Sequence, residues 1–220
     1  MEPVTVVLGL LVLQGGLGAI DTFVSHEWRE QLPHQPWAVR ELALHATRST
    51  FFAAIFAGMA WFEWHGAWAW AMLAVMLVEY AVTTVDSIVE DRTRALSSFE
   101  RTNHMLLALN TGLYTAFMLL QLGASWLRLP SGIVVARHPL WLALPLSACA
   151  LGAAIWAVRD ALASRRLRHA GAASPAARHG TGTDKRLSAE AAPGSENGSC
   201  TLAQRAAAAP APAPAKDNAA

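Results

Sequence analysis

Long apolar stretches alternate with short polar connections along most of the chain. A helix needs about 20 mostly apolar residues to cross the roughly 30 Å hydrocarbon core of a bilayer. Five stretches reach this length, at about 4–24, 46–64, 67–85, 105–127 and 140–158. The pattern therefore predicts an all-α, polytopic membrane protein with five transmembrane helices.

The arginines between these stretches indicate how the helices are oriented. Most of them lie after the first, third and fifth stretches, whereas the opposite side holds only Arg128 and Arg137. Because cytoplasmic loops carry an excess of Lys and Arg, we predict an outward N-terminus and a cytoplasmic C-terminus in a bacterial-type inner membrane. Tryptophans expected in an outer interfacial belt flank the second connection: Trp61, Trp64, Trp68 and Trp70.

The composition narrows the class of protein. Of the 220 residues 54% are hydrophobic and 15% are charged, against about a quarter charged in soluble domains. The net charge of +1 provides no basic field for nucleic acid. The two cysteines, Cys149 and Cys200, cannot form a disulfide framework. A soluble enzyme, a disulfide-rich secreted domain and a wholly disordered chain are all poor fits.

The end of the chain differs in composition from the rest. Residues 165–220 are rich in Ala and Pro and almost lack large apolar side chains, so they cannot bury enough surface to fold. We predict a disordered cytoplasmic tail there, and a transmembrane helical domain over 1–164.

The first four stretches resemble two copies of one helix pair, about 4–64 and 67–127. Asp21 matches Asp86, each followed by Thr or Ser and, after one more residue, by Val. Glu41-x-x-x-His45 matches Glu100-x-x-x-His104, and each pair opens the next apolar helix. The matches predict a duplicated two-helix unit that forms a four-helix bundle.

The repeated polar residues fall at one depth, the cytoplasmic ends of the four helices. Carboxylates gathered there repel one another, and bound divalent cations would remove that repulsion. Imidazoles among carboxylates suit first-row transition metals better than Ca²⁺ or Mg²⁺. We therefore predict two transition-metal ions, assigned as iron, with these ligands: Asp21, Glu41, His45, Asp86, Glu100 and His104.

This ligand pattern resembles the di-iron carboxylate four-helix bundles of the ferritin-like type. In those proteins two helices each give one carboxylate, and two others each give a Glu-x-x-His pair. Here the spacing is Glu-x-x-x-His, and two carboxylates are Asp. The resemblance implies a non-haem metal oxidoreductase or oxygenase. Because the metal pair would lie at the cytoplasmic boundary and open onto lipid, we predict a lipid-soluble substrate and a cytoplasmic electron donor.

Two further carboxylates lie on the same stripe of the third helix. We assign Glu90 and Glu79 to catalytic roles beside the metal, as groups that support its ligands or carry protons. His26 lies five residues after Asp21, about 140° around an α-helix, so it would join the site only if the helix had ended. Arg48 could orient a carboxylate or bind a lipid phosphate.

Other interpretations stay open. Charged residues near helix ends often form surface ion pairs that contribute about 0–1 kcal/mol. His45 and His104 could instead be the axial ligands of haem b. A third class is a membrane protein without catalysis, an ion transporter or a scaffold, although no continuous acidic ladder crosses the membrane. Gly15, Gly16 and Gly18 would allow the first helix to approach a neighbour closely.

Overall fold

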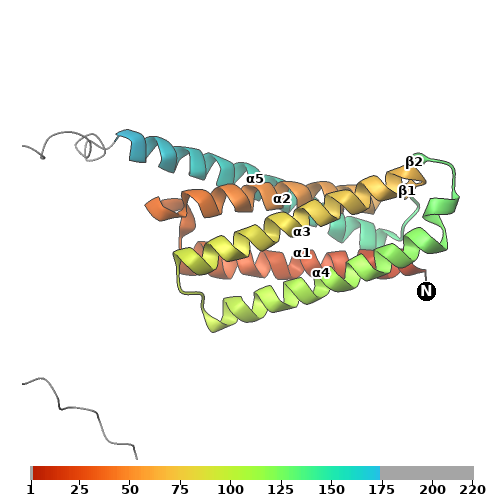
Figure 1. The fold of residues 1–220 in the computed structure, drawn as a ribbon, viewed down its shortest axis with the longest axis horizontal. Helices are drawn as coiled ribbons and strands as arrows, with labels where there is room; N and C mark the ends of the chain where they lie inside the picture. Colours follow the sequence, from red (N-terminus) through yellow and green to blue (C-terminus); the bar gives the residue numbers. More distant parts are fainter. Residues whose placement is uncertain (1, 174–220) are drawn as a thin grey trace, which may run out of the picture. The chain divides into compact units, whose positions relative to one another are not determined.

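The computed structural model describes residues 2–173, and five long helices dominate this part of the chain (Figure 1). They are α1 (Pro3–Ile20), α2 (Val39–Trp61), α3 (Ala67–Thr93), α4 (Ser98–Ala124) and α5 (Leu140–Ala173). A π-helix, η1 (Asp21–Arg29), continues α1, and the short 3₁₀ turns η2 (Leu32–His34) and η3 (Pro36–Ala38) lead into α2. The all-α prediction is confirmed.

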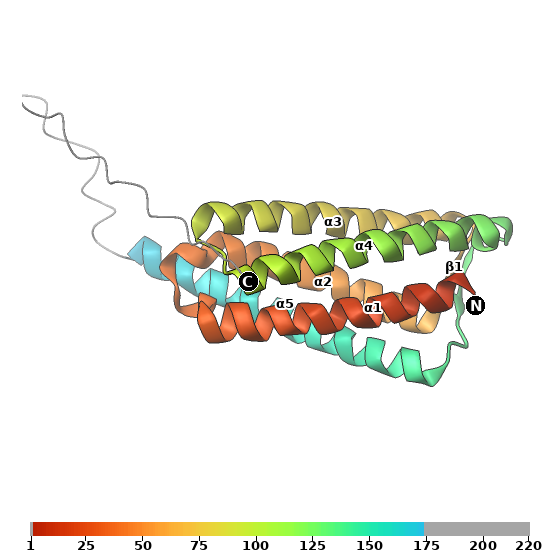
Figure 2. The same ribbon diagram turned by 90° about the horizontal axis from the view of Figure 1, so that it is seen from below.

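The fifth helix is part of the bundle. α2 packs against α3 on one side and against α5 on the other, while α1 packs against α4 and α5. Figure 2 shows α3 and α4 along one side, α1 and α5 along the other, and α2 between them. The predicted bundle of four helices is therefore a bundle of five, in which α5 fills the space beside α1 and α2.

Four of the described helices are long and apolar enough to cross a membrane: Pro3–Arg29, Ala67–Thr93, Ser98–Arg128 and Leu140–Gly171. They indicate a multi-pass membrane protein, and large apolar side chains on their outer faces are exposed, among them Leu77, Leu120 and Leu151. α2 has 23 residues, about 34 Å of helix, but it carries charged residues in its first half. Its neighbours bury Glu41 and Arg48, whereas Arg40 in the first turn is exposed, so α2 is the internal helix of the bundle beyond its first turn.

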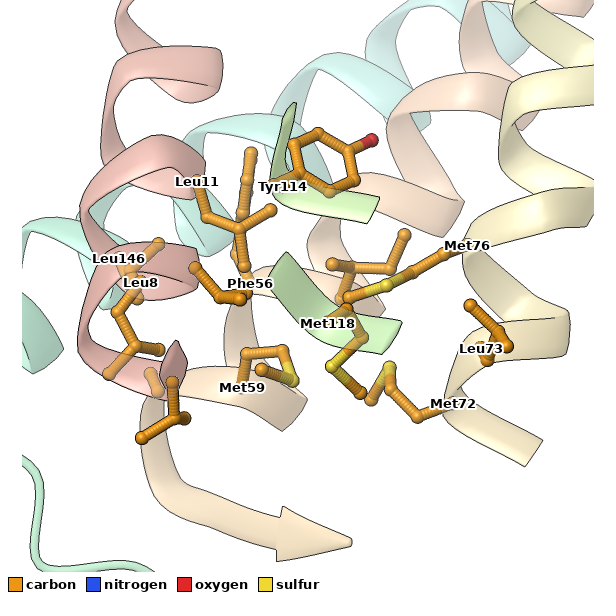
Figure 3. Close-up of a cluster of buried hydrophobic side chains, with 14 of the residues drawn as sticks. Leu8, Leu11, Phe56, Met59, Met72, Leu73, Met76, Tyr114, Met118 and Leu146 are labelled. Atoms are coloured by element: carbon orange, nitrogen blue, oxygen red, sulfur yellow. The ribbon is translucent and has the colours of Figure 1, made fainter. Parts of the chain in front are cut away.

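The apolar core lies toward the end of the bundle opposite the polar residues. All five helices contribute to it, with Leu8 and Leu11 from α1, Met59 from α2, Met118 from α4 and Leu146 from α5, each less than 2% exposed. Figure 3 shows these side chains in one cluster with Met72 and Met76 of α3. The cluster makes the interior of this end of the bundle mainly apolar, with Gln121 as a buried polar residue that accepts a hydrogen bond from the Val4 N–H.

Two short strands close the same end. β1 (Phe62–His65) pairs antiparallel with β2 (Gly132–Val135). Gly66 follows β1 with φ +57°, a conformation that glycine adopts at little cost. The loops that join α1 to α2 and α3 to α4 lie at the opposite, polar end (Figure 1).

Two boundaries bear on the predictions. α5 runs to Ala173, beyond the expected helix at 140–158, and includes the first residues of the predicted tail; the remainder, 174–220, lies outside the described residues. The predicted duplication stays a prediction, and the two halves differ locally. Asp21 begins a π-helix, whereas Asp86 lies within the α-helix α3.

Candidate metal centre

Buried polar side chains from every helix converge at the end of the bundle away from the strands. Each of the following is at most 7% exposed: Asp21, His26, Glu41, His45, Arg48, Asp86, Glu90, Glu100 and Asp160. Buried charges normally require partners or bound ions. Their partners therefore determine what this region can do.

The π-helix places His26 in the centre. In a π-helix the hydrogen bonds join residues five apart, so Asp21 and His26 come onto one face although an α-helix would separate them. Nε2 of His26 lies 3.6 Å from both Oδ2 of Asp21 and Oε1 of Glu90. The sequence left His26 open because nothing in the pattern distinguishes a π-helix from an α-helix.

Two groups of ligand atoms have the spacing of a metal site. Asp21, His26 and Glu100 form one group, and His26, Glu41 and Glu90 form the other. Within each group the ligand atoms lie within 4.8 Å of one another, and all the residues are buried. The two groups share His26, so they form one continuous centre.

Many polar atoms of this centre lack a hydrogen-bond partner within the described part of the chain. They include both ring nitrogens of His26, both carboxylate oxygens of Glu90 and of Asp86, and single oxygens of Asp21 and Glu41. More than nine in ten buried polar groups in proteins have a partner. Unpartnered oxygen and imidazole nitrogen atoms are the donor set that a transition-metal ion requires.

Charge leads to the same conclusion. Five carboxylates, those of Asp21, Glu41, Asp86, Glu90 and Glu100, face two guanidinium groups, those of Arg48 and Arg94. Three negative charges therefore remain unbalanced when the imidazoles are neutral. Bound divalent cations would supply the missing positive charge, and so would protons on His26 and His104, each of which lies within 3.7 Å of Asp21 and Glu90.

Arg94 joins the two Glu-x-x-x-His helices. Its Nη2 lies 3.1 Å from Oε1 of Glu41 and 2.5 Å from Oε1 of Glu100, and its Nη1 donates to Oε2 of Glu100 at 2.9 Å. Burial lowers the pKa of Arg94, but the hydrogen bonds and charges of Glu100 and Glu41 raise it by more, so its pKa lies above the usual value. Ser97 caps the N-terminus of α4, and its side chain accepts a hydrogen bond from the Glu100 N–H, which positions Glu100.

Three residues predicted as ligands lie outside the two groups and contact other partners. Nδ1 of His45 lies 2.7 Å from Oδ2 of Asp160, Asp86 is 3.3 Å from Nη1 of Arg48, and His104 Nε2 is 3.2 Å from Oδ2 of Asp21. The rings of His26 and His45 also stack, with centroids 4.5 Å apart. Arg48 thus orients a carboxylate, one of the two roles suggested by its position.

The two predicted catalytic carboxylates occupy different places. Glu90 belongs to one of the groups that can hold a metal. Glu79 lies deeper in the bundle, 1% exposed, and accepts a 2.5 Å hydrogen bond from Thr83. Beyond it a buried network continues, in which Asn110 donates to Gln14 at 2.7 Å and Gln14 to Thr111 at 3.3 Å.

Asp160 is not among the site residues predicted from the sequence. The one signal available was a carboxylate just after the fifth apolar stretch.

Comparisons of the chain with protein-family models, with curated proteins and with solved structures give no match. Of the features that suggested a di-iron bundle, the structure shows two: buried carboxylate and imidazole groups that could hold metal, and long apolar helices.

Proposed function

We propose that this chain is a membrane-embedded metal-dependent oxidoreductase or oxygenase that acts on a lipid-soluble substrate at the cytoplasmic side of the membrane. Asp21, His26, Glu41, Glu90 and Glu100 would hold two transition-metal ions, iron in our assignment. When bound, iron supplies the activation of dioxygen. In an oxygenase reaction, dioxygen, two electrons from a cytoplasmic reductase and two protons convert a C–H bond to C–OH and release water.

One observation carries this proposal: His26, 2% exposed with both ring nitrogens unpartnered, lies beside Glu90, neither of whose oxygens has a hydrogen-bond partner in the described residues, and beside Asp21, which has one oxygen without a partner. An imidazole in such a set favours a transition metal over Ca²⁺ or Mg²⁺, which prefer oxygen ligands. The hydrogen bond between His45 and Asp160 supports a further ligand, because metal-binding histidines commonly donate their other N–H to a carboxylate.

The proposed topology places α2 as the fifth span and the centre on the cytoplasmic side. The arginines at the polar end of the bundle, among them Arg92, Arg94 and Arg101, support this orientation. The internal position of α2 supports its spanning role, since Glu41 and Arg48 contact protein instead of lipid.

A transporter is the runner-up, because Glu79 and the network around Gln14 extend the polar region inward. An ion path must cross the whole membrane. The apolar cluster in Figure 3 occupies the other end of the bundle, with Met59 and Met118 completely buried. This cluster favours a closed enzyme over a continuous path.

Haem b remains the second metal alternative, since His45 and His104 both line the same cavity.

Elemental analysis and an absorption spectrum of the detergent-purified full-length protein distinguish the non-haem metal centre, the haem site and the transporter. We expect about two iron or manganese ions per chain without a haem band, and loss of metal in a folded His26→Ala variant. His65→Ala, at the opposite end of the bundle, is the matched control.

The opposite results are equally informative. A haem band that is lost in His45→Ala would replace the proposed centre with haem b. Absence of any transition metal after expression with iron and manganese would exclude the oxidoreductase and favour the transporter or scaffold.

A further inference from the structure

A cavity of about 890 Å³ lies between the five helices and adjoins the metal centre. His45, Arg48 and His104 line it where it meets the centre. The volume falls in the range of roughly 300–1,000 Å³ found for small-molecule pockets. The cavity is therefore large enough to hold a ligand beside the metal ligands.

Most of the remaining wall is apolar. Phe52 and Phe56 of α2 and Trp156 of α5 contribute aromatic surface. A Cβ atom added at Gly18 or Gly152 would meet nothing within 4 Å, and both glycines line the cavity, so the missing side chains leave room within it. Such a wall suits a long apolar chain.

The cavity reaches the outer face of the helices. Three of its lining residues are about half exposed, namely Phe23 at 54%, Tyr80 at 49% and Ile88 at 46%. In a bilayer these side chains face lipid. A molecule dissolved in the membrane could therefore enter between the helices without passing through water.

Arg48 defines the polar end of the cavity. It is only 7% exposed and forms an ion pair with Asp86, but it donates no hydrogen bond to any side chain or carbonyl of the described residues. A guanidinium has five N–H donors, so donors remain for a ligand oxygen. The other charged lining residues, Asp91 and Arg92, carry opposite charges, and Asp86 already pairs with Arg48. The net charge at this end therefore does not favour an anion, which leaves an uncharged acceptor as the matching head group.

We propose that this cavity binds a single-chain amphiphile with an uncharged, oxygen-bearing head, the chemistry of a long-chain alcohol or aldehyde. The chain lies along Phe52, Phe56 and Trp156, and the head oxygen accepts hydrogen bonds from Arg48 beside His45 and His104. Oxidation of this ligand at the metal centre rests on the proposed function, whereas binding of the ligand in the cavity requires no metal.

Photolabelling tests this inference. The full-length protein in phosphatidylcholine vesicles is irradiated with a long-chain alcohol that carries a diazirine in its chain, and the labelled residues are mapped by mass spectrometry. Phe56 is 3% exposed and cannot be labelled from the lipid, whereas Leu120 is 59% exposed and reports lipid contact. We expect labelling at Phe56 as well as at Leu120.

Gly18→Phe should fill the cavity and reduce labelling at Phe56 by about tenfold, equivalent to about 1.4 kcal/mol of binding, with Leu120 unaffected. Gly16→Phe is the matched control, because Gly16 is exposed and outside the cavity lining. Gly152→Leu provides a second blocking variant from α5 if Gly18→Phe fails to fold.

Three outcomes would overturn the proposal: labelling confined to exposed residues, labelling of Phe56 that Gly18→Phe leaves unchanged, or preferential labelling by a fatty-acid diazirine at neutral pH. The same samples are analysed with and without bound metal. Labelling that persists in metal-free protein supports the cavity even if the oxidoreductase fails, and metal without labelling refutes the cavity alone.

Discussion

His45 and Asp160 join the centre of the bundle to its last helix, with 2.7 Å between Nδ1 and Oδ2. Both side chains are at most 3% exposed. A carboxylate in this position fixes the ring orientation and directs the lone pair of the other nitrogen away from itself. α5 therefore positions a predicted metal ligand that α2 supplies.

Replacement of Asp160 should weaken metal binding without removing any carboxylate of the two groups. We expect Asp160→Asn to lower metal affinity by about 10–100-fold, measured by competition with a coloured chelator. Asp91→Asn is the control, since Asp91 is 61% exposed and pairs only with Arg101 among the described residues. Equal affinity in the two variants would show that His45 does not act as a ligand.

Arg94 should stabilise the metal-free protein by balancing Glu41 and Glu100. Arg94→Met leaves both carboxylates buried without a cation, which we expect to cost about 3–5 kcal/mol in the free energy of unfolding. Arg101→Met removes an exposed pair and should cost about 0–1 kcal/mol. Both are measured by denaturant unfolding in detergent after chelation.

Metal should restore stability to the Arg94→Met protein more than to the wild type, because bound cations replace the missing charge. A ligand at about 100 times its Kd stabilises by about 2.7 kcal/mol. Identical metal-induced shifts in Tm for the two proteins would show that the ions bind away from Glu41 and Glu100.

Glu90 and Glu79, two carboxylates of α3, should differ in their effect on metal binding. Glu90→Gln removes a carboxylate of a ligand group and should lower metal affinity by at least about tenfold. Glu79→Gln, bonded to Thr83 deeper in the bundle, should leave metal content unchanged. Elemental analysis of both variants measures the bound metal. Loss of metal from Glu79→Gln alone would show that the metal binds deeper in the bundle, near Glu79.

Gly15 allows α1 to approach α5. A Cβ at this position would lie 2.4 Å from Sγ of Cys149, so we expect Gly15→Ala to destabilise the protein by about 1–3 kcal/mol. Cys149→Ala in the same chain should recover part of this loss, since it removes the clashing sulfur. Gly16→Ala, with nothing within 4 Å, should be neutral; thermal unfolding of the four proteins tests the set.

Apolar length predicted the helices but not their ends. The third and fourth stretches were placed at 67–85 and 105–127, whereas α3 runs to Thr93 and α4 begins at Ser98. Hydropathy detects the apolar part of a helix, which faces lipid or the apolar core. The turns that carry Asp86, Glu90 and Glu100 are helical too, but they are polar because they face the centre.

The candidate centre was predictable where local repetition marked it and unpredictable where distant contacts built it. Asp21, Glu41 and Glu100 came from the internal matches and belong to the groups that can hold a metal. His26 depends on a π-helix, and Asp160 depends on the packing of α5 against α2. Hydropathy and residue spacing do not reveal a local change from α-helix to π-helix. They also do not reveal the contact between His45 and Asp160, which lie 115 residues apart.

The internal position of α2 affects how the protein is made. α2 emerges early from the ribosome with its charged residues uncovered, whereas α5, which packs along it and supplies Asp160, is the last described helix to be synthesised. Until α5 arrives, His45 lacks its partner and one side of α2 is open. The complete centre, including the contact between His45 and Asp160, can therefore form only after α5 has been synthesised.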